Sequence, residues 1–367
     1  MIAAFSDVFA DVTKQGTKLQ TSEYLASGKY PIIDQGQDDI AGYTDREDGL
    51  FTDVPAIIFG DHTRIVKYVD MPFFLGADGV KVLKATIPDV DYRYLYYAVS
   101  AVKIPNTGYN RHFKWLKEAQ ISLPDLSTQR RIADTLDKVS EGIGLCGRMM
   151  DELDLMVKAK FGEMFGDAHN NSAFPYKNIG DLTTVTSGGT PDRENNLYWD
   201  DGNIRWIKTT ELQNCTICDT EEKITKLGLE NSSAKLVPAG SVLIAMYGQG
   251  KTRGMTAYLE NESATNQACA CILPSSKINQ KYLWKYLMLS YDKLRSMAKG
   301  GNQPNLNIGI IKNFPVLYPP IELQNQYVEF VIYIDKSILT IKGILAKMEE
   351  MKLALMQKCF KEGKHGE

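Results

Sequence analysis

The sequence repeats itself, and this duplication constrains the fold more than any other feature. Pro124 and Gln129 match Pro319 and Gln324, and both pairs are separated by 195 residues. Each match lies near the start of a long segment with helical character. An internal repeat of this length predicts that one structural unit is used twice in the chain.

Apolar residues recur after each matched segment in alternating steps of three and four, as in the heptad seam of a coiled coil. The seam positions are Ile132, Leu136, Val139, Ile143, Cys146, Met150, Leu153 and Val157 in the first copy, and Tyr327, Val331, Ile334, Ile338, Ile341, Leu345 and Met348 in the second. We expect the two helices to pair through Leu136, Val139, Ile143, Val331, Ile334 and Ile338. Two amphipathic helices in separate domains are the alternative.

The matches continue beyond the prolines and glutamines. Asp137-Lys138 matches Asp335-Lys336 at a separation of 198, which predicts three extra residues in the second helix. Gly142, Gly144 and Gly147 lie inside the first predicted helix, where each costs up to about 1 kcal/mol relative to alanine.

Fainter matches precede each helix and predict a similar globular domain before it. They pair T-K-Q-G-T-K (13–18) with T-S-G-G-T-P (186–191), the buried strands at 54–60 and 239–248, the helices at 92–97 and 281–287, and the loops at 108–110 and 300–307. The predicted fold is α/β, with two similar globular domains separated by two long antiparallel coiled-coil helices in approximate two-fold symmetry. We expect domains at 1–123 and 167–317, a central helix at 124–166 and a C-terminal helix at 318–363.

Composition and targeting signals indicate an ordinary cytoplasmic protein. Hydrophobic residues make up 44% and charged residues 24% of the 367 residues, as in soluble globular proteins. The N-terminus does not resemble a signal peptide, and no apolar run reaches the roughly 18 residues of a membrane span. The six cysteines are expected to be reduced.

The charge distribution argues against a DNA clamp that acts alone. Net charge is −3 for residues 1–123, −2 for 124–166, +2 for 167–317 and 0 for 318–367. Proteins that grip DNA unaided usually carry a basic excess, because phosphate neutralisation dominates their affinity. Any DNA grip by this chain therefore has to be shared with a partner.

The duplicated plan resembles the specificity subunits of type I restriction-modification systems. The resemblance covers nearly the whole chain and is carried by L-P-D-L-S-T-Q-R-R-I-A-D-T-L-D (123–137), P-P-I-E-L-Q-N-Q-Y-V-E-F-V (319–331) and S-G-G-T-P (187–191). The resemblance implies a non-catalytic subunit whose two globular domains are target-recognition domains, each reading half of a bipartite site in double-stranded DNA. It also implies paired helices that set the spacing and dock two methyltransferase subunits.

The resemblance further implies that no cofactor binds this chain, because S-adenosylmethionine binds the methyltransferase subunits. Two motor-nuclease restriction subunits are optional further partners. Helices of about 35 residues would span roughly 50 Å, about one and a half turns of DNA. That length fits a target with an unread spacer.

Candidate base-reading and phosphate-binding residues lie in polar loops. Arginine and lysine pair with guanine, and asparagine and glutamine with adenine. In the first domain we select Gln35, Gln37, Arg64, Tyr109, Asn110, Arg111, His112 and Lys114. In the second we select Lys208, Thr209, Gln249, Lys251, Arg253, Asn266, Gln267, Asn302, Gln303 and Asn305. Surface loops with incidental amides are the alternative.

Other functions have weaker support in the sequence. Pro191-Asp192 with Glu221-Glu222-Lys223 spells the P-D…E-x-K pattern of Mg²⁺-dependent nucleases. G-Q-G-K-T (248–252) lacks the first glycine of a phosphate-binding loop, and Y-P-P-I (318–321) lacks the flanking residues of an amino-methyltransferase motif. The cysteines at 215, 218, 269 and 271 could form a zinc site, although their spacing does not require one. A coiled-coil scaffold without DNA contact is the remaining alternative.

Overall fold

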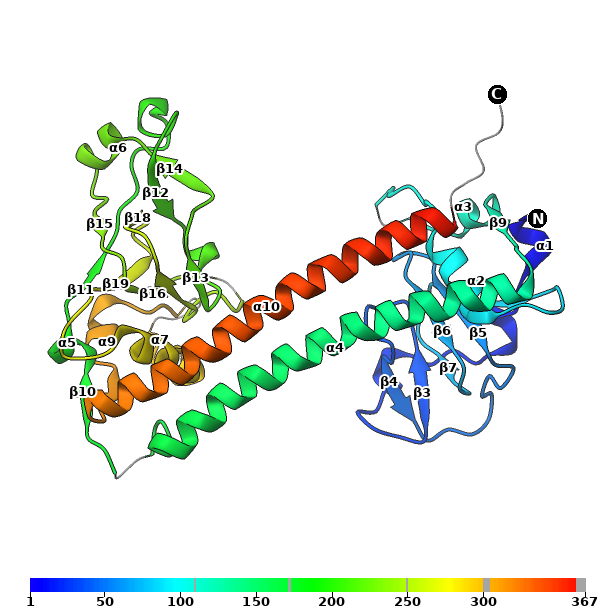
Figure 1. The fold of residues 1–367 in the computed structure, drawn as a ribbon, viewed down its shortest axis with the longest axis horizontal. Coiled ribbons are helices and arrows are strands. Elements are labelled where there is room, and N and C mark those ends of the chain that lie inside the picture. The colour runs from blue at the N-terminus through cyan, green and yellow to red at the C-terminus, as the bar shows by residue number, and fades with distance from the viewer. Residues whose placement is uncertain (109, 171–172, 249, 300–303, 361–367) are drawn as a thin grey trace. The chain divides into compact units, whose positions relative to one another are not determined.

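The computed structural model describes residues 1–108, 110–170, 173–248, 250–299 and 304–360. The chain forms two compact units. The first contains Met1–Arg148 and the segment from Ile341 onward, and the second contains Met149–Thr340. Two long helices, α4 (Leu126–Phe165) and α10 (Ile321–Cys359), each contribute to both units (Figure 1).

Short strands and helices build the globular part of the first unit. The strands are β1 (Ile2–Ala4), β2 (Phe9–Asp11), β3 (Tyr30–Ile33), β4 (Gly42–Thr44), β5 (Ala56–Gly60), β6 (Val66–Val69), β7 (Phe74–Leu75), β8 (Val80–Ala85) and β9 (Gln120–Ser122). The helices are α1 (Phe5–Val8), α2 (Tyr92–Ser100) and α3 (Phe113–Lys117), with single 3₁₀ turns at Thr13–Gln15 and Thr21–Glu23.

The second unit uses a similar but longer set. The strands are β10 (Tyr176–Asn178), β11 (Val185–Ser187), β12 (Ile204–Ile207), β13 (Cys215–Ile217), β14 (Glu222–Ile224), β15 (Leu236–Val237), β16 (Val242–Ala245), β17 (Thr256–Leu259), β18 (Ser263–Thr265), β19 (Cys269–Ile272) and β20 (Pro315–Leu317). The helices are α5 (Ile179–Leu182), α6 (Lys226–Glu230), α7 (Gln280–Leu289), α8 (Tyr291–Ser296) and α9 (Ile308–Lys312), and 3₁₀ turns lie at Asn196–Tyr198 and Thr209–Glu211.

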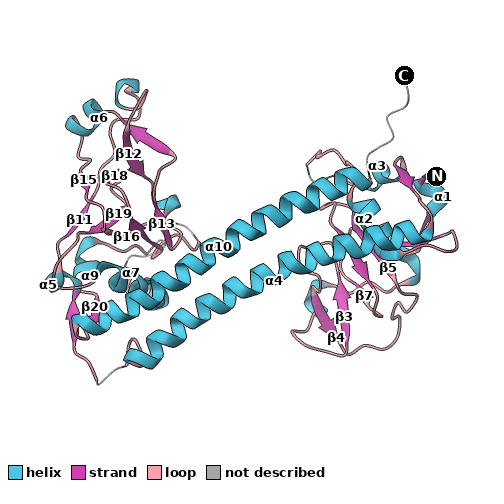
Figure 2. Cartoon of the chain, in the orientation of Figure 1, coloured by secondary structure: helices cyan, strands magenta, loops and turns pink. Residues whose placement is uncertain are grey.

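The sheets of the two units share a common strand order, to which the second unit adds β13 in the larger sheet and β15 in the smaller one. The sheet β2-β8-β5-β6 corresponds to β11-β19-β16-β17-β13, and β4-β3-β7 corresponds to β14-β12-β18-β15. In these smaller sheets, β3 and β12 each run antiparallel to one neighbour and parallel to the other. The small sheets β1-β9 and β10-β20 also correspond. Figure 2 shows the strands gathered in the two units, with none in the two long helices. The predicted α/β fold with a duplicated domain is confirmed.

The buried amides of Gln129 and Gln324 explain the repeated Pro-x4-Gln spacing. Gln129 accepts a hydrogen bond from the backbone N–H of Asp91 (3.1 Å) and donates one to the carbonyl of Pro124 (2.8 Å). Gln324 makes the same two bonds, with the N–H of Asn279 (2.9 Å) and the carbonyl of Pro319 (2.8 Å). Asp91 and Asn279 are the N-caps of α2 and α7. Each glutamine therefore joins a long helix to the short helix of its domain.

Close backbone packing explains the glycines of S-G-G-T-P. A side chain on Gly188 would overlap the carbonyl of Thr265, and one on Gly189 would overlap the backbone at Ser233. The Gly189 carbonyl also accepts a hydrogen bond from the indole of Trp206 (2.9 Å). The motif therefore joins the two sheets of the second unit, which is a structural function.

The predicted seam positions of both long helices are all buried or half-buried. In the first unit, a side chain on Gly142 of α4 would overlap Met348 of α10, so glycine allows close approach there. In the second unit, Phe161 of α4 packs edge-to-face on Tyr327 of α10, with ring centroids 5.6 Å apart. The two helices pack together in antiparallel directions within each unit. α4 ends at Phe165, and the next residue, Gly166, has a positive φ of 74°, which is typical of a glycine just after a helix C-terminus.

The prediction of three extra residues in the second helix is wrong. Burial matches at a constant separation of 195, pairing Leu136 with Val331 and Val139 with Ile334. At that separation Asp335 corresponds to Ser140. Asp335 pairs with Lys285 of α7 in the second domain, and Ser140 contacts Tyr97 of α2 in the first domain. The Asp-Lys match at 198 is a coincidence of composition.

No helix among the described residues is long and apolar enough to cross a membrane.

Candidate nucleic-acid interface

The turn between β5 and β6 is the centre of the candidate interface in the first unit. Asp61, which is 5% exposed, accepts a hydrogen bond from the N–H of Phe113 through its carboxylate (2.8 Å). The N–H of His62 donates to the side chain of Gln35 (3.1 Å), and the Thr63 hydroxyl donates to the Gln35 carbonyl (2.7 Å). Three segments that are distant in sequence therefore meet at this turn.

The exposed candidates of the first unit lie on these segments. Gln37, Asn110, Arg111 and Lys114 are exposed, and Arg64 is half-buried. Arg64 has a left-handed backbone (φ 63°), and its guanidinium donates to the carbonyl of Ile104 (3.3 Å). Among the described residues, Arg64, Arg111 and Lys114 form no ion pair. Amides and cations without an ion-pair partner thus share one edge of the unit.

Two first-unit candidates have structural functions instead. His112 is fully buried, its N–H donates to the carbonyl of Asp61 (2.7 Å), and its Nδ1 lies 3.0 Å from the same oxygen. We therefore remove His112 from the candidate interface. Gln35 is half-buried, and its amide group donates to the carbonyl of Asp78 (2.9 Å), so it holds the loop in place. Tyr109 lies outside the described residues.

A buried lysine that the sequence analysis did not select supports the same edge. The side chain of Lys67 is 5% exposed, and its ammonium donates to the carbonyl of Asp38 (2.5 Å) and lies 3.6 Å from the Asp34 carboxylate. Gln35 and Gln37 belong to the loop between these two aspartates. Lys67 lies in an ordinary strand sequence (β6), and a lysine in such a strand is usually exposed. The sequence therefore gave no sign that Lys67 is buried against this loop.

The corresponding loop of the second unit joins β16 to β17 and is braced by α8. Arg295 donates to the carbonyls of Arg253 (2.6 Å) and Gly250 (2.9 Å), and Tyr291 donates to the carbonyl of Lys251 (2.7 Å). Lys251 itself is exposed. The sequence analysis missed Tyr291 and Arg295, whose only signal is their i, i+4 spacing on a helix.

The other second-unit candidates are partly engaged within the domain. Arg253 donates to the carbonyl of Pro304, and the backbones of Asn305 and Lys299 form an isolated bridge. Asn266 caps a turn by accepting from the N–H of Ala268 (3.2 Å), and exposed Gln267 accepts from the Thr190 hydroxyl. Thr209 is half-buried in its 3₁₀ turn. Gln249, Asn302 and Gln303 lie outside the described residues.

Lys208 is a poor phosphate ligand in this conformation. Its ammonium pairs with Glu221 (2.8 Å) and Glu222 (3.0 Å), and these two carboxylates raise the lysine pKa. Burial raises the pKa of Glu222, but hydrogen bonds from Arg193 and Lys208 outweigh it, so the net direction is downward. Lys208 is therefore neutralised within the domain, and the prediction of a phosphate contact loses its support.

The nuclease pattern is not assembled into a site. Asp192 accepts the N–H of Glu194 in a local turn (3.0 Å), while Glu222 pairs with Arg193. Arg193 lies over the Trp199 ring, 3.7 Å from its centroid, and lines a pocket of about 310 Å³ with Trp199 and Glu222. In the described parts of the chain, no group of three His, Cys, Asp or Glu side chains could hold a metal ion. The cysteines at 215, 218, 269 and 271 therefore do not form a zinc site among the described residues.

Comparisons with known proteins agree with this architecture. A family model described as "Type I restriction modification DNA specificity domain" matches residues 4–153 and 171–350. The chain belongs to this type I DNA specificity family. A specificity subunit recognises the DNA target within the restriction-modification complex and is its non-catalytic member. The two matched segments contain the two duplicated domains.

Individual relatives support the assignment over most of the chain. The EcoR124I/EcoR124II specificity subunit of Escherichia coli is 25% identical over 348 residues, covering 89% of this chain and 85% of the relative. The HindI specificity subunit of Haemophilus influenzae is 26% identical over 153 residues, covering 40% of this chain and 32% of the relative.

Solved structures share the fold. The S subunit of a type I system from M. genitalium has a TM-score of 0.63 at 16% identity, with 99% of this chain and 96% of that chain covered. A chain from a study of complex assembly and conformational transition in the type I R-M system has a TM-score of 0.57 at 16% identity, with 99% and 98% covered.

Proposed function

We propose that this specificity subunit binds a split target in double-stranded DNA and that each unit reads one half. The observation that carries the proposal is the duplicated edge of polar loops. The β5–β6 turn and the β16–β17 loop occupy equivalent places in corresponding sheets. Each is held by side-chain hydrogen bonds from a distant segment and flanked by exposed cations or amides. Base edges are read by such side chains, and phosphates by the cations.

The length of the helices supports a target with an unread spacer. α4 contains 40 residues without interruption, which corresponds to about 60 Å at 1.5 Å per residue. One turn of B-DNA is roughly 34–36 Å long. Helices of this length can therefore separate two reading domains by more than one turn.

We infer that the subunit acts with two methyltransferase subunits, which carry S-adenosylmethionine, and with two motor-nuclease subunits as optional partners. The net charge of −3 leaves much of the phosphate grip to such partners. Each long helix also exposes apolar side chains outside its seam, including Leu145, Met149 and Met156 on α4 and Tyr333, Ile344 and Met351 on α10. We assign these side chains to contacts with the partner subunits, because apolar surface gathered on an exposed face is typical of protein interfaces. Such an enzyme works in the cytoplasm, where its DNA lies.

The test is DNA binding by the purified chain, alone and with its candidate methyltransferase subunits, at stated salt. Selection from a random duplex library should enrich two short sequences separated by a fixed, unread spacer, with affinity much higher in the complex. Substitutions at Lys251 should alter only the half-site read by the second unit, and substitutions at Arg111 only the other. Enrichment of a single continuous site, or none in the complex, would contradict the proposal.

A further inference from the structure

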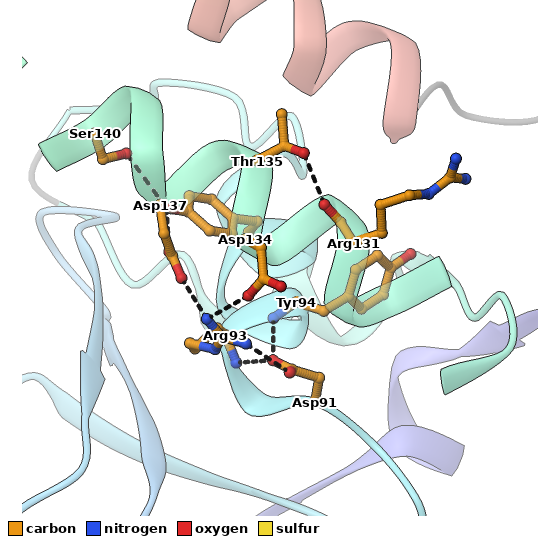
Figure 3. Close-up of polar contacts among 9 residues, drawn as sticks. Asp91, Arg93, Tyr94, Arg131, Asp134, Thr135, Asp137 and Ser140 are labelled. Carbon is orange, nitrogen blue, oxygen red and sulfur yellow. Dashed lines mark hydrogen bonds and ion pairs between the residues drawn. The ribbon is translucent and has the colours of Figure 1, made fainter. Parts of the chain in front are cut away.

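An ion cluster joins α4 to the first domain, and the described residues form no equivalent cluster at the matching joint of the second domain. Arg93, the second residue of α2, lies among three carboxylates (Figure 3). Its Nη1 is 2.8 Å from Asp137 and 2.9 Å from Asp134, both on α4, and its Nη2 is 3.1 Å from Asp91. One guanidinium therefore connects the N-cap of α2 with two successive turns of the long helix.

Further hydrogen bonds fix the carboxylates around Arg93. The Tyr97 hydroxyl donates to Asp137 (2.7 Å) and lies 3.3 Å from the Ser140 hydroxyl. The Asp91 carboxylate accepts the N–H groups of Arg93 and Tyr94. The Asp91 side chain is 10% exposed and the Asp137 side chain 28% exposed. The cluster is thus partly shielded from water, and the carboxylates of Asp91 and Asp137 accept hydrogen bonds from neighbouring groups as well as from Arg93.

The equivalent joint of the second domain is built differently. Asn279 replaces Asp91 as the N-cap, and Lys281 replaces Arg93, with its ammonium 5.2 Å from the centre of the Tyr258 ring. One ion pair, Lys285–Asp335 at 3.3 Å, joins α7 to α10. At this joint, among the residues that the structure describes, only the first domain surrounds one cation with several carboxylates.

We propose that Arg93 is a positioning residue that sets the direction in which α4 leaves the first recognition domain, and thereby the spacer length that the subunit accepts. The inference rests on the proposed function. Partly exposed ion pairs add little to stability, and the apolar packing around Ala133 is non-directional. The planar guanidinium, by contrast, has donors at fixed angles. Three carboxylates also repel one another unless a cation lies between them.

The experiment uses the complete complex with its methyltransferase subunits. Binding is measured to duplexes that carry both half-sites with spacers of the preferred length and one base pair shorter or longer. In Arg93→Met, the preference for the correct spacer should fall several-fold, while base preference within the first half-site stays unchanged. Arg93→Lys should be intermediate, because an ammonium cannot span the same three carboxylates.

Arg131→Met is the matched control. Arg131 is an exposed residue of α4 whose side chain points away from the cluster in Figure 3. This variant removes the same charge from the same region and should keep the wild-type spacer preference. The double variant Asp134→Asn, Asp137→Asn weakens the joint from the helix side. It should relax spacer preference as Arg93→Met does, and it provides the test if that variant does not fold.

The outcomes separate this inference from the function on which it rests. If the variants bind every duplex more weakly by one common factor, with spacer preference intact, Arg93 only stabilises the domain and the inference is wrong. If the wild-type complex itself shows no dependence on a second half-site or on spacer length, the proposed split target is wrong, whatever the variants do.

Discussion

The duplicated Pro-x4-Gln spacing has a physical reason in the buried side chains of Gln129 and Gln324. Each glutamine is 3% exposed or less and forms hydrogen bonds with two backbone groups. A buried polar group without a partner costs about 1–3 kcal/mol. The glutamine is therefore needed wherever a long helix meets the N-cap of a short one, and its counterpart is needed in the other domain for the same reason.

Gln324→Ala should lower the free energy of unfolding of the second unit by about 1–3 kcal/mol, because it leaves the Asn279 N–H and the Pro319 carbonyl unpaired. Denaturant unfolding followed at the second-unit tryptophans would measure the change. Gln326→Ala, at an exposed position two residues along the same helix, should change stability by less than about 0.5 kcal/mol. Equal effects of the two substitutions would mean that the buried amide has no special function.

Lys114 tests the electrostatic part of the interface. The residue is exposed, and its ammonium lies 4.1 Å from the centre of the Trp115 ring. If it contacts a phosphate, Lys114→Ala should weaken binding to all DNA sequences alike and reduce the slope of log K against log salt by about 1. Titrations of the complex at several salt concentrations would measure it. Lys29 lies just before the first residue of β3, whereas the candidate interface follows the last residue of that strand. Lys29→Ala is therefore the control and should leave the slope of log K against log salt unchanged.

At the scale of elements, the two long helices begin in different ways. The Asp125 carboxylate accepts hydrogen bonds from the Ser127 hydroxyl (2.6 Å) and the Thr128 N–H (3.0 Å) at the start of α4. The corresponding residue before α10 is Pro320, which has no side-chain acceptor. The α4 N-terminus therefore depends on an ionised group, whereas the α10 N-terminus does not.

Asp125→Ala should speed hydrogen exchange at the first amides of α4 and leave those of α10 unchanged. The hydrogen bonds, that of Ser127 first, lower the pKa of Asp125 below its usual value. The contribution is therefore complete above the unfolded pKa of about 3.9 and is lost as pH falls through the lower folded pKa. Thermal unfolding at pH 7 should separate wild type and variant, and the difference should shrink in strong acid. A difference that grows in acid would contradict this assignment.

The elements that the sequence predicted are those with local signals. The two long helices, the buried strands β5 and β16 and the helices α2 and α7 follow from periodicity within short windows, and the structure confirms these elements. The predicted seam positions are buried or half-buried. The predicted length difference between the two long helices is wrong, because it followed the Asp-Lys match at a separation of 198 and not the apolar pattern. Apolar burial is the stronger guide to register, because a shift would move every seam residue to the wrong face.

The candidate site was less predictable because its contacts join distant segments. Buried His112 contacts the carbonyl of Asp61, 51 residues away, and Lys208 is neutralised by Glu221 and Glu222 at the start of β14. Nothing in the local sequence distinguishes these side chains from Arg111 or Lys251, which remain exposed. One sequence identifies polar loops, and tertiary packing decides which of their residues are available to DNA.

At the scale of the whole molecule, the proposed function couples helix length to target length. Gly142 approaches Met348 in the antiparallel pair, so the peptide bonds after Gly147 and after Lys342 lie roughly opposite each other. Four residues inserted at both places lengthen both helices by about 6 Å. B-DNA rises about 3.4 Å per base pair, since a turn of 34–36 Å holds 10–10.5 base pairs.

The doubly lengthened subunit, in complex with its methyltransferase partners, should therefore select a spacer one to two base pairs longer, about 6 Å divided by the rise per base pair. Both half-site sequences should stay as in the wild type, because the loops that read them are untouched. Selection from duplexes with randomised spacer lengths measures the shift. An insertion in α4 alone is the control, because it mismatches the seams and should reduce stability without defining a new spacer. An unchanged spacer in the double insertion would show that the helices do not determine the distance between half-sites.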